Sequence, residues 1–258
     1  MPSMKEICDV IRARFDAMDA ARERSLAISR KITRDSGDAI KAIHREEWDR
    51  ADALVCETGD LVLEVNDMLL DFPDIYYSGF VGNAQAEFAE VSLLRAVLRG
   101  ETPPSPQSLG VDDAAYLAGM GDATGELRRR ILDLIRLGRP EEGEKYLETM
   151  DEFYTEMMSF DYPDAITHGL RKKTDVARSL IERTRGDLTN ALQVKDLKAS
   201  LAGFERSATK ATEGTKATKN SKGTGGTKAM KNSKGTGGTK AMKNIKGTKA
   251  NRATRANK

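Results

Sequence analysis

Apolar side chains recur at three- and four-residue intervals along most of residues 3–204, with charged residues between them. This spacing is that of one face of an α-helix and differs from the alternation of a half-buried strand. Aromatic residues make up only 5% of the chain, and runs of β-branched residues are short. The sequence therefore predicts an all-α fold, an elongated bundle of about six to seven helices.

Interruptions of the apolar pattern predict where the helices end. We expect a first helix over residues 3–33 and an interruption at Arg34–Asp38, where Ser36 or Asp38 could cap the next helix. The second helix would run over residues 37–70, and at 1.5 Å per residue it would be about 50 Å long. Such a length suits an elongated bundle or a curved shell.

The rest of the chain shows the same pattern between proline- and glycine-containing breaks. A corner is expected at Pro73, which has no backbone N–H to donate. Helices are predicted over residues 75–99, 111–137, 140–157 and 166–192, with a loop at 100–110 and a second corner at 161–164.

The formal net charge of +2 hides a marked asymmetry. From Ala211 onward there are 13 Lys and Arg against the single acid Glu213, a net of +12, which leaves −10 for residues 1–210. A 12-residue string at 220–231 is repeated at 232–243. We expect a helical domain over residues 1–206 and a disordered tail over 207–258, because so polar a segment cannot form a packed core. The lysines could attract phosphates without sequence preference, or the tail could serve solubility alone.

Four acidic residues form two pairs at helical spacing. Glu87 and Glu90 are three apart, and Asp122 and Glu126 are four apart, so each pair shares a helix face. Glu87 falls in line with the core stripe of its helix, and a buried carboxylate is costly unless it is paired or bound to metal. Carboxylates suit Mg²⁺, which takes oxygen ligands. Asp122 and Glu126 could instead belong to an ordinary solvated face.

Three glycines, Gly119, Gly121 and Gly125, lie among the second pair of acids. Each costs roughly 1 kcal/mol relative to alanine inside a helix. This cost is usually tolerated where another backbone must approach closely. We therefore expect this strip of the helix to be crowded.

Other chemistries lack their sequence signatures. Neither His44 nor His168 has Glu three residues before it, so the Glu-x-x-His pairs of di-iron bundles are missing, and no P-loop is present. Both histidines are expected to be ordinary surface or interface residues.

Cys8 and Cys56 form no CxxC pair, which favours reduced thiols. No apolar stretch reaches the length of a membrane span, so we expect a cytoplasmic protein without membrane contact.

Two strings resemble the translin superfamily. The more specific is Tyr116-Leu117-Ala118-Gly119-x-x-Asp122-x-Thr124-Gly125-Glu126-Leu127, and the second is Ala86-Glu87-Phe88-Ala89-Glu90, which resembles the family's Glu-x-x-Glu string with Ala86 in place of Gln. Further likeness is found at residues 29–33, 41–45 and 169–173. The resemblance covers about residues 15–204 and is greater to translin-associated factor X, the nuclease branch, than to translin. The family's basic and aromatic string after the paired tyrosines is absent, since Tyr76-Tyr77 precedes Ser78-Gly79-Phe80-Val81-Gly82.

The resemblance implies a metal-dependent endoribonuclease that cleaves single-stranded RNA inside a hollow, translin-like shell, in the family a homo-octamer. Glu87, Glu90, Asp122 and Glu126 match the family's catalytic acids, and we expect Glu90, Asp122 and Glu126 to bind Mg²⁺ or Mn²⁺ or to orient water. A single-stranded DNA partner is a further possibility. We expect the RNA contacts among the basic residues Lys31, Arg34, Lys41, Arg45, Arg95, Arg99, Arg128, Arg129, Lys172 and Lys173.

Two other functions compete with the nuclease. In a non-catalytic shell that binds single strands, the acids would only pair with arginines, and binding would need no Mg²⁺. An unrelated helical scaffold would lose all nucleic-acid affinity when residues 207–258 are removed.

Overall fold

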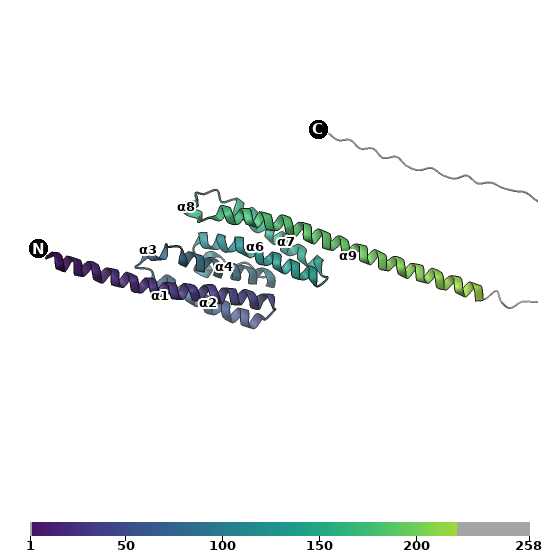
Figure 1. Ribbon diagram of the computed structural model, residues 1–258, viewed down its shortest axis with the longest axis horizontal. Coiled ribbons are helices and arrows are strands. Elements are labelled where there is room, and N and C mark those ends of the chain that lie inside the picture. The colour runs from purple at the N-terminus through teal and green to yellow at the C-terminus, as the bar shows by residue number, and fades with distance from the viewer. Residues whose placement is uncertain (1, 221–258) are drawn as a thin grey trace, which may run out of the picture. The chain divides into compact units, whose positions relative to one another are not determined.

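The computed structural model describes residues 2–220, and every regular element among them is helical (Figure 1). The predicted all-α class is therefore confirmed. The elements in chain order are α1 Met4–His44, α2 Trp48–Met68, α3 Pro73–Tyr76, α4 Phe80–Arg99, α5 Pro106–Leu109, α6 Asp113–Arg136, the 3₁₀ helix η1 Pro140–Gly143, α7 Glu144–Met158, α8 Asp164–Thr167 and α9 Leu170–Asn220. None of the helices within residues 2–220 has the length and apolar character that crossing a membrane would require.

Met1–Phe204 form one compact unit, and the description that follows concerns this unit. Helix α9 continues to Asn220, beyond residue 206, where the sequence predicts the end of the helical domain. Of the tail predicted to be disordered over 207–258, residues 207–220 belong to α9, and residues 221–258, with the repeat up to 243, lie outside the described residues.

Helix α4 lies at the centre of the unit. Most of its side chains are buried, including Val81, Phe88 and Leu94, because other helices pack against more than one of its faces. Helices α1 and α2 pack on one side of α4, and α6 packs on the other (Figure 1). Helix α7 and the first part of α9 cover the far side of α6, where Leu188 lies close to Gly143 and Arg128 donates to Thr184.

Both ends of α4 are fixed by glycines with positive φ. Gly79 precedes the helix at φ +96°, and Gly100 caps its end at φ +69°. Residues with a side chain rarely adopt this backbone conformation, so glycine allows the chain to take it at both ends of α4. The helix predicted from residue 75 is therefore two elements, the short α3 and then α4, while α5 occupies part of the loop predicted at 100–110.

The predicted interruption at Arg34–Asp38 is wrong, because α1 runs through it. Ser36 is fully buried inside the helix and caps nothing. Ile32 and Ile40 are buried on either side of it, so the apolar stripe of α1 continues without a break. The helix ends instead at His44, and Glu46 takes φ +61° in the turn before α2. A single helix over residues 37–70 is consequently also wrong.

Two apolar stripes are left exposed within the compact unit. The first covers the opening turns of α1, at Met4, Ile7, Val10, Ile11 and Phe15, and the second lies on α9 at Val194, Leu197, Leu201 and Phe204. An exposed apolar patch of this kind is typical of an interaction surface.

Candidate active site

The backbones of α4 and α6 touch where the sequence places the acidic pairs. A Cβ atom added to Gly119 of α6 would lie 2.5 Å from the carbonyl oxygen of Ala86 and 2.7 Å from the backbone nitrogen of Glu90. The predicted close backbone approach is therefore found at Gly119. At Gly121 the crowding comes from the side chains of Lys173 and Met157, and at Gly125 it is absent. The contact brings Glu87 and Glu90 beside Asp122.

Glu90 is the most perturbed of the four acids. Its side chain is almost fully buried, at 9% exposure for the residue, and burial together with the charges of Asp122, Glu87 and Glu126 raises its pKa to about 8. Lys173 opposes this shift. The pKa of Glu87 is also raised, first by burial and then by Asp122. The negative charges of the neighbouring acids thus add to burial in disfavouring the ionised forms of Glu90 and Glu87.

Glu126 is held by a histidine from α1. The Nε2 atom of His44 lies 2.5 Å from Oε2 of Glu126, and the histidine side chain is only 4% exposed. This hydrogen bond lowers the pKa of Glu126 despite burial, with a smaller contribution from Arg129 at 3.5 Å. The expectation that His44 is an ordinary surface or interface residue is therefore wrong, whereas His168 is exposed as expected.

Asp122 is held by a lysine from α9. The Nζ atom of Lys173 donates to both carboxylate oxygens of Asp122, at 2.6 and 2.7 Å. The stem of Lys173 packs on Gly121, where an added Cβ would lie 2.9 Å from the lysine Cβ. Lys173, expected among the RNA contacts, is thus paired with one of the four acids.

The acidic cluster, defined as Glu87, Glu90, Asp122 and Glu126, has the donor chemistry that Mg²⁺ prefers. Its possible ligands are all carboxylate oxygens. The Lys173 ammonium, which donates to Asp122, occupies a position at which a cation could bind this carboxylate. In the arrangement described for residues 2–209, no three Asp, Glu, His or Cys side chains already converge as a metal site. The residues fit the ion in kind, and Asp122 would have to exchange Lys173 for it.

Most of the basic residues expected to contact RNA are engaged in ion pairs. The pairs are Lys31 with Asp35, Lys41 with Asp38, Arg45 with Glu47, Arg128 with Asp187 and Arg129 with Glu126. The side chains of Arg34 and Lys172 make no such pair within the described residues, and Arg34 lines a surface hollow with Arg30. These two are the candidates whose charge is least compensated.

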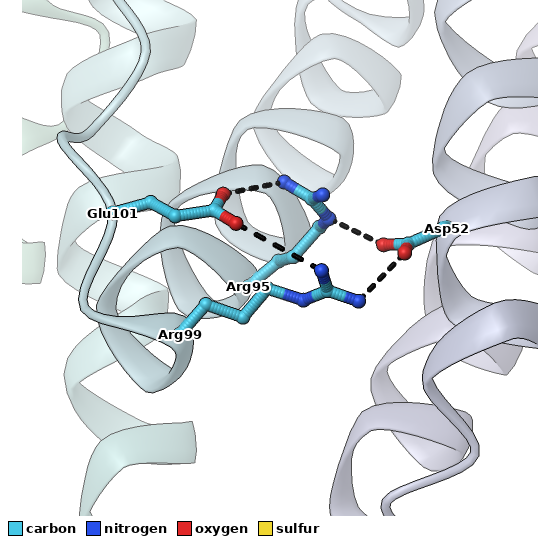
Figure 2. A network of polar contacts seen from close by, with 4 residues as sticks. All are labelled: Asp52, Arg95, Arg99 and Glu101. Atoms are coloured by element: carbon cyan, nitrogen blue, oxygen red, sulfur yellow. Dashed lines mark hydrogen bonds and ion pairs between the residues drawn. The ribbon is translucent and has the colours of Figure 1, made fainter.

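Arg95 and Arg99 belong to a structural network between α2 and the end of α4 (Figure 2). Asp52 accepts from Nε of Arg95 and from Nη2 of Arg99, both at 2.6 Å, and Glu101 lies 3.0 Å from Arg95 and 3.8 Å from Arg99. The guanidinium of Arg99 also lies 5.0 Å from the ring centre of Trp48. Two carboxylates thus offset the charge of both arginines.

The comparisons with known proteins agree with this architecture. No protein family model matches the sequence. The uncharacterized protein MJ0175 of Methanocaldococcus jannaschii is 31% identical over 185 residues, which are 71% of this chain and 82% of that protein.

Similar solved structures come from the C3PO assemblies of the translin family. A structure of AfC3PO is 33% identical with a TM-score of 0.68, covering 72% of this chain and 97% of that one. A complex of AfC3PO with duplex RNA gives 32% identity and the same TM-score and coverage. Apo-NeC3PO is 22% identical with a TM-score of 0.67, covers 74% of this chain and all of that one, and supports the fold alone. On the identity and coverage shared with AfC3PO, the chain belongs to the translin superfamily.

Proposed function

We propose that this protein is a metal-dependent endoribonuclease, of the kind found in the branch of translin-associated factor X, which cleaves single-stranded RNA. The observation that carries the proposal is the clustering of four carboxylates on two touching helices, where burial and then the neighbouring acids raise the pKa of Glu90 to about 8. Strongly perturbed acids that share a site are typical of catalytic centres. A purely structural role would not require so unfavourable a group.

Glu90, Asp122 and Glu126 are the residues that would hold Mg²⁺ or Mn²⁺, with Glu87 beside them. When bound, the ion would lower the pKa of a water and offset charge developing on the scissile phosphate. His44 orients the Glu126 carboxylate through its Nε2 atom. Lys173 keeps a positive charge at the cluster and, released from Asp122, becomes available to a phosphate oxygen.

Two observations support RNA as the substrate. The similar AfC3PO has been seen in complex with duplex RNA. In this chain, Arg34 and Lys172 form no ion pair within the described residues, and the lysine-rich sequence after Ala211 adds further positive charge. Electrostatic attraction of this kind would also extend to single-stranded DNA.

We further propose that the chain works as a homo-octamer with the acidic cluster on an inner wall. The exposed apolar stripes on α1 and α9 support self-association, because they leave large side chains such as Phe15 and Phe204 uncovered. Sedimentation of the full chain tests this state, and a monomer at micromolar concentration would contradict it.

A non-catalytic single-strand binder is the competing function. It is favoured by the pairing of Asp122 with Lys173 and of Glu126 with His44 and Arg129, which occupies two of the four acids. In that case the carboxylates would stabilise the bundle and take no part in chemistry.

Labelled single-stranded RNA incubated with the full chain separates the two functions. The nuclease predicts cleavage in Mg²⁺ or Mn²⁺, none in EDTA, and a loss of at least about a hundredfold in Glu90→Gln, because a metal ligand is removed. Glu101→Gln is the matched control, since the Glu101 carboxylate pairs with Arg95 and Arg99 in the network of Figure 2 and lies outside the acidic cluster. RNA binding without cleavage under any metal condition would overturn the nuclease.

A further inference from the structure

We infer that a cavity beside the acidic cluster receives one unpaired base of a bound RNA strand. This inference rests on the RNA-binding part of the proposed function. The cavity has a volume of about 150 Å³ and lies between α3, α4, α6 and the end of α8. Pockets for drug-sized ligands occupy about 300–1,000 Å³. The space therefore suits a single flat ring system.

The cavity and the acidic cluster share the seam between α4 and α6. Ala86, which lines the cavity, directly precedes Glu87, and Ala118 lies four residues before Asp122. One helical turn is about 5.4 Å. The backbone of Ala118 therefore lies about one turn from that of Asp122, and the backbone of Ala86 lies about one turn from that of Glu90. A base held in the cavity would place a neighbouring phosphate of the same strand at the cluster.

An exposed aromatic ring lies at the cavity. Tyr77 is 73% exposed, and its ring meets that of Tyr76 edge to face, with the ring centres 5.0 Å apart. His168, which takes φ +47° at the end of α8, also lines the cavity. Aromatic rings with an open face are the usual stacking platforms for unpaired bases.

The hydroxyl of Tyr76 is held by hydrogen bonds to Asp112 and to a buried glutamine, Gln85. The hydroxyl donates to Oδ1 of Asp112 and accepts from Nε2 of Gln85, both at 3.0 Å. Gln85 is fully buried, and its Oε1 accepts from the backbone N–H of Asp112 at 3.2 Å. This network fixes the wall before any ligand binds, which lowers the entropic cost of binding.

The lining favours a base over a phosphate. Among the described residues, no lysine or arginine lines the cavity, and the Asp112 carboxylate would repel a phosphate. The exposed amide of Asn83 offers both a donor and an acceptor to the edge of a base. Bases inside an A-form duplex remain stacked and paired, so the cavity selects single-stranded RNA or an unpaired end.

The test uses the full chain in EDTA and short single-stranded RNAs with 2-aminopurine at each position in turn. Fluorescence of this base is quenched when it stacks, so the wild-type protein should quench it at one favoured position. Tyr77→Ala should abolish that quenching and weaken binding about tenfold. Tyr77→Phe, which keeps the ring, should retain both. The matched control is Tyr162→Ala, which removes another exposed tyrosine, 60% exposed, and should change neither.

The outcomes distinguish this inference from the proposed function. Quenching and binding by Tyr77→Ala equal to wild type, or a Tyr77→Phe variant as weak as Tyr77→Ala, would overturn the base site even if the protein cleaves RNA. Tyr77-dependent quenching without cleavage in Mg²⁺ would leave the base site standing and overturn the nuclease. Absence of RNA binding by the wild-type protein would overturn both.

Discussion

Gly119 of α6 and Ala86 of α4 are in direct backbone contact, so that a Cβ atom at Gly119 would lie 2.5 Å from the Ala86 carbonyl oxygen. Neither backbone can yield without separating the helices that carry the acidic cluster. The acidic cluster therefore requires glycine, which has no Cβ atom, at position 119.

Gly119→Ala should destabilise the protein by about 1–3 kcal/mol, the usual cost of overpacking. It should also separate Glu87 and Glu90 from Asp122. Gly125→Ala is the matched change on the same helix, because its Cβ would meet only Leu180 at 3.9 Å. That variant should gain up to about 1 kcal/mol from helix propensity. Chemical denaturation measures both, and equal stabilities would contradict the close contact.

Lys173→Met keeps the packing of the lysine stem and removes its charge. Asp122 would then be free of its cationic partner, so the full chain should bind Mn²⁺ about two- to fivefold more tightly, since a partly exposed ion pair is worth up to about 1 kcal/mol. Calorimetric titration at pH 9, where protons compete little for the carboxylates, measures the change. Lys172→Met is the control, and weaker Mn²⁺ binding by Lys173→Met would contradict the competition.

The raised pKa of Glu90 predicts how stability changes with pH. Its folded pKa of about 8 lies above the unfolded value near 4.5, so between these values the folded state binds more protons than the unfolded state. Stability without metal should therefore be highest below about pH 4.5, as far as this group contributes, and should fall as pH rises to about 8. Glu90→Gln should remove most of this fall, up to a few kcal/mol at pH 9. Denaturation in EDTA at several pH values measures it, and an unchanged pH profile in the variant would contradict the shift.

His44 is expected to act by positioning Glu126. His44→Phe should lower kcat about 10- to 100-fold with little change in KM, as is typical when the residue that orients a metal-binding side chain is lost. His44→Gln, which still offers an N–H donor, should restore part of the rate. Steady-state cleavage kinetics measure both variants. A Gln variant as slow as the Phe variant, with both normally folded, would indicate that His44 serves packing alone.

The sequence predicts the class and most helix positions, because apolar spacing and glycine or proline breaks are local signals. It also predicts the crowding at Gly119, since a costly glycine inside a helix requires a local reason. It fails at Ser36, where a local capping signal is overridden by the apolar stripe of α1, and at Glu46, where the chain turns without glycine or proline.

The partners of the acids could not be predicted in the same way. His44 is 82 positions from Glu126, and Lys173 is 51 positions from Asp122, so neither contact leaves a spacing signal. Only the packing of α1 and α9 around α6 brings them together. The sequence predicts RNA contacts for Arg95 and Arg99 for a related reason. Asp52, which offsets their charge, lies on α2, and so distant a partner leaves no spacing signal.

The most direct test of the acidic cluster is a crystal structure of the full chain grown with Mn²⁺, with the anomalous signal of the ion recorded. We predict an ion bound by carboxylate oxygens of Glu90, Asp122 and Glu126, with the Lys173 ammonium displaced from Asp122. Lys173 still bound to both oxygens of Asp122 at saturating Mn²⁺, with no anomalous peak at the cluster, would contradict the account.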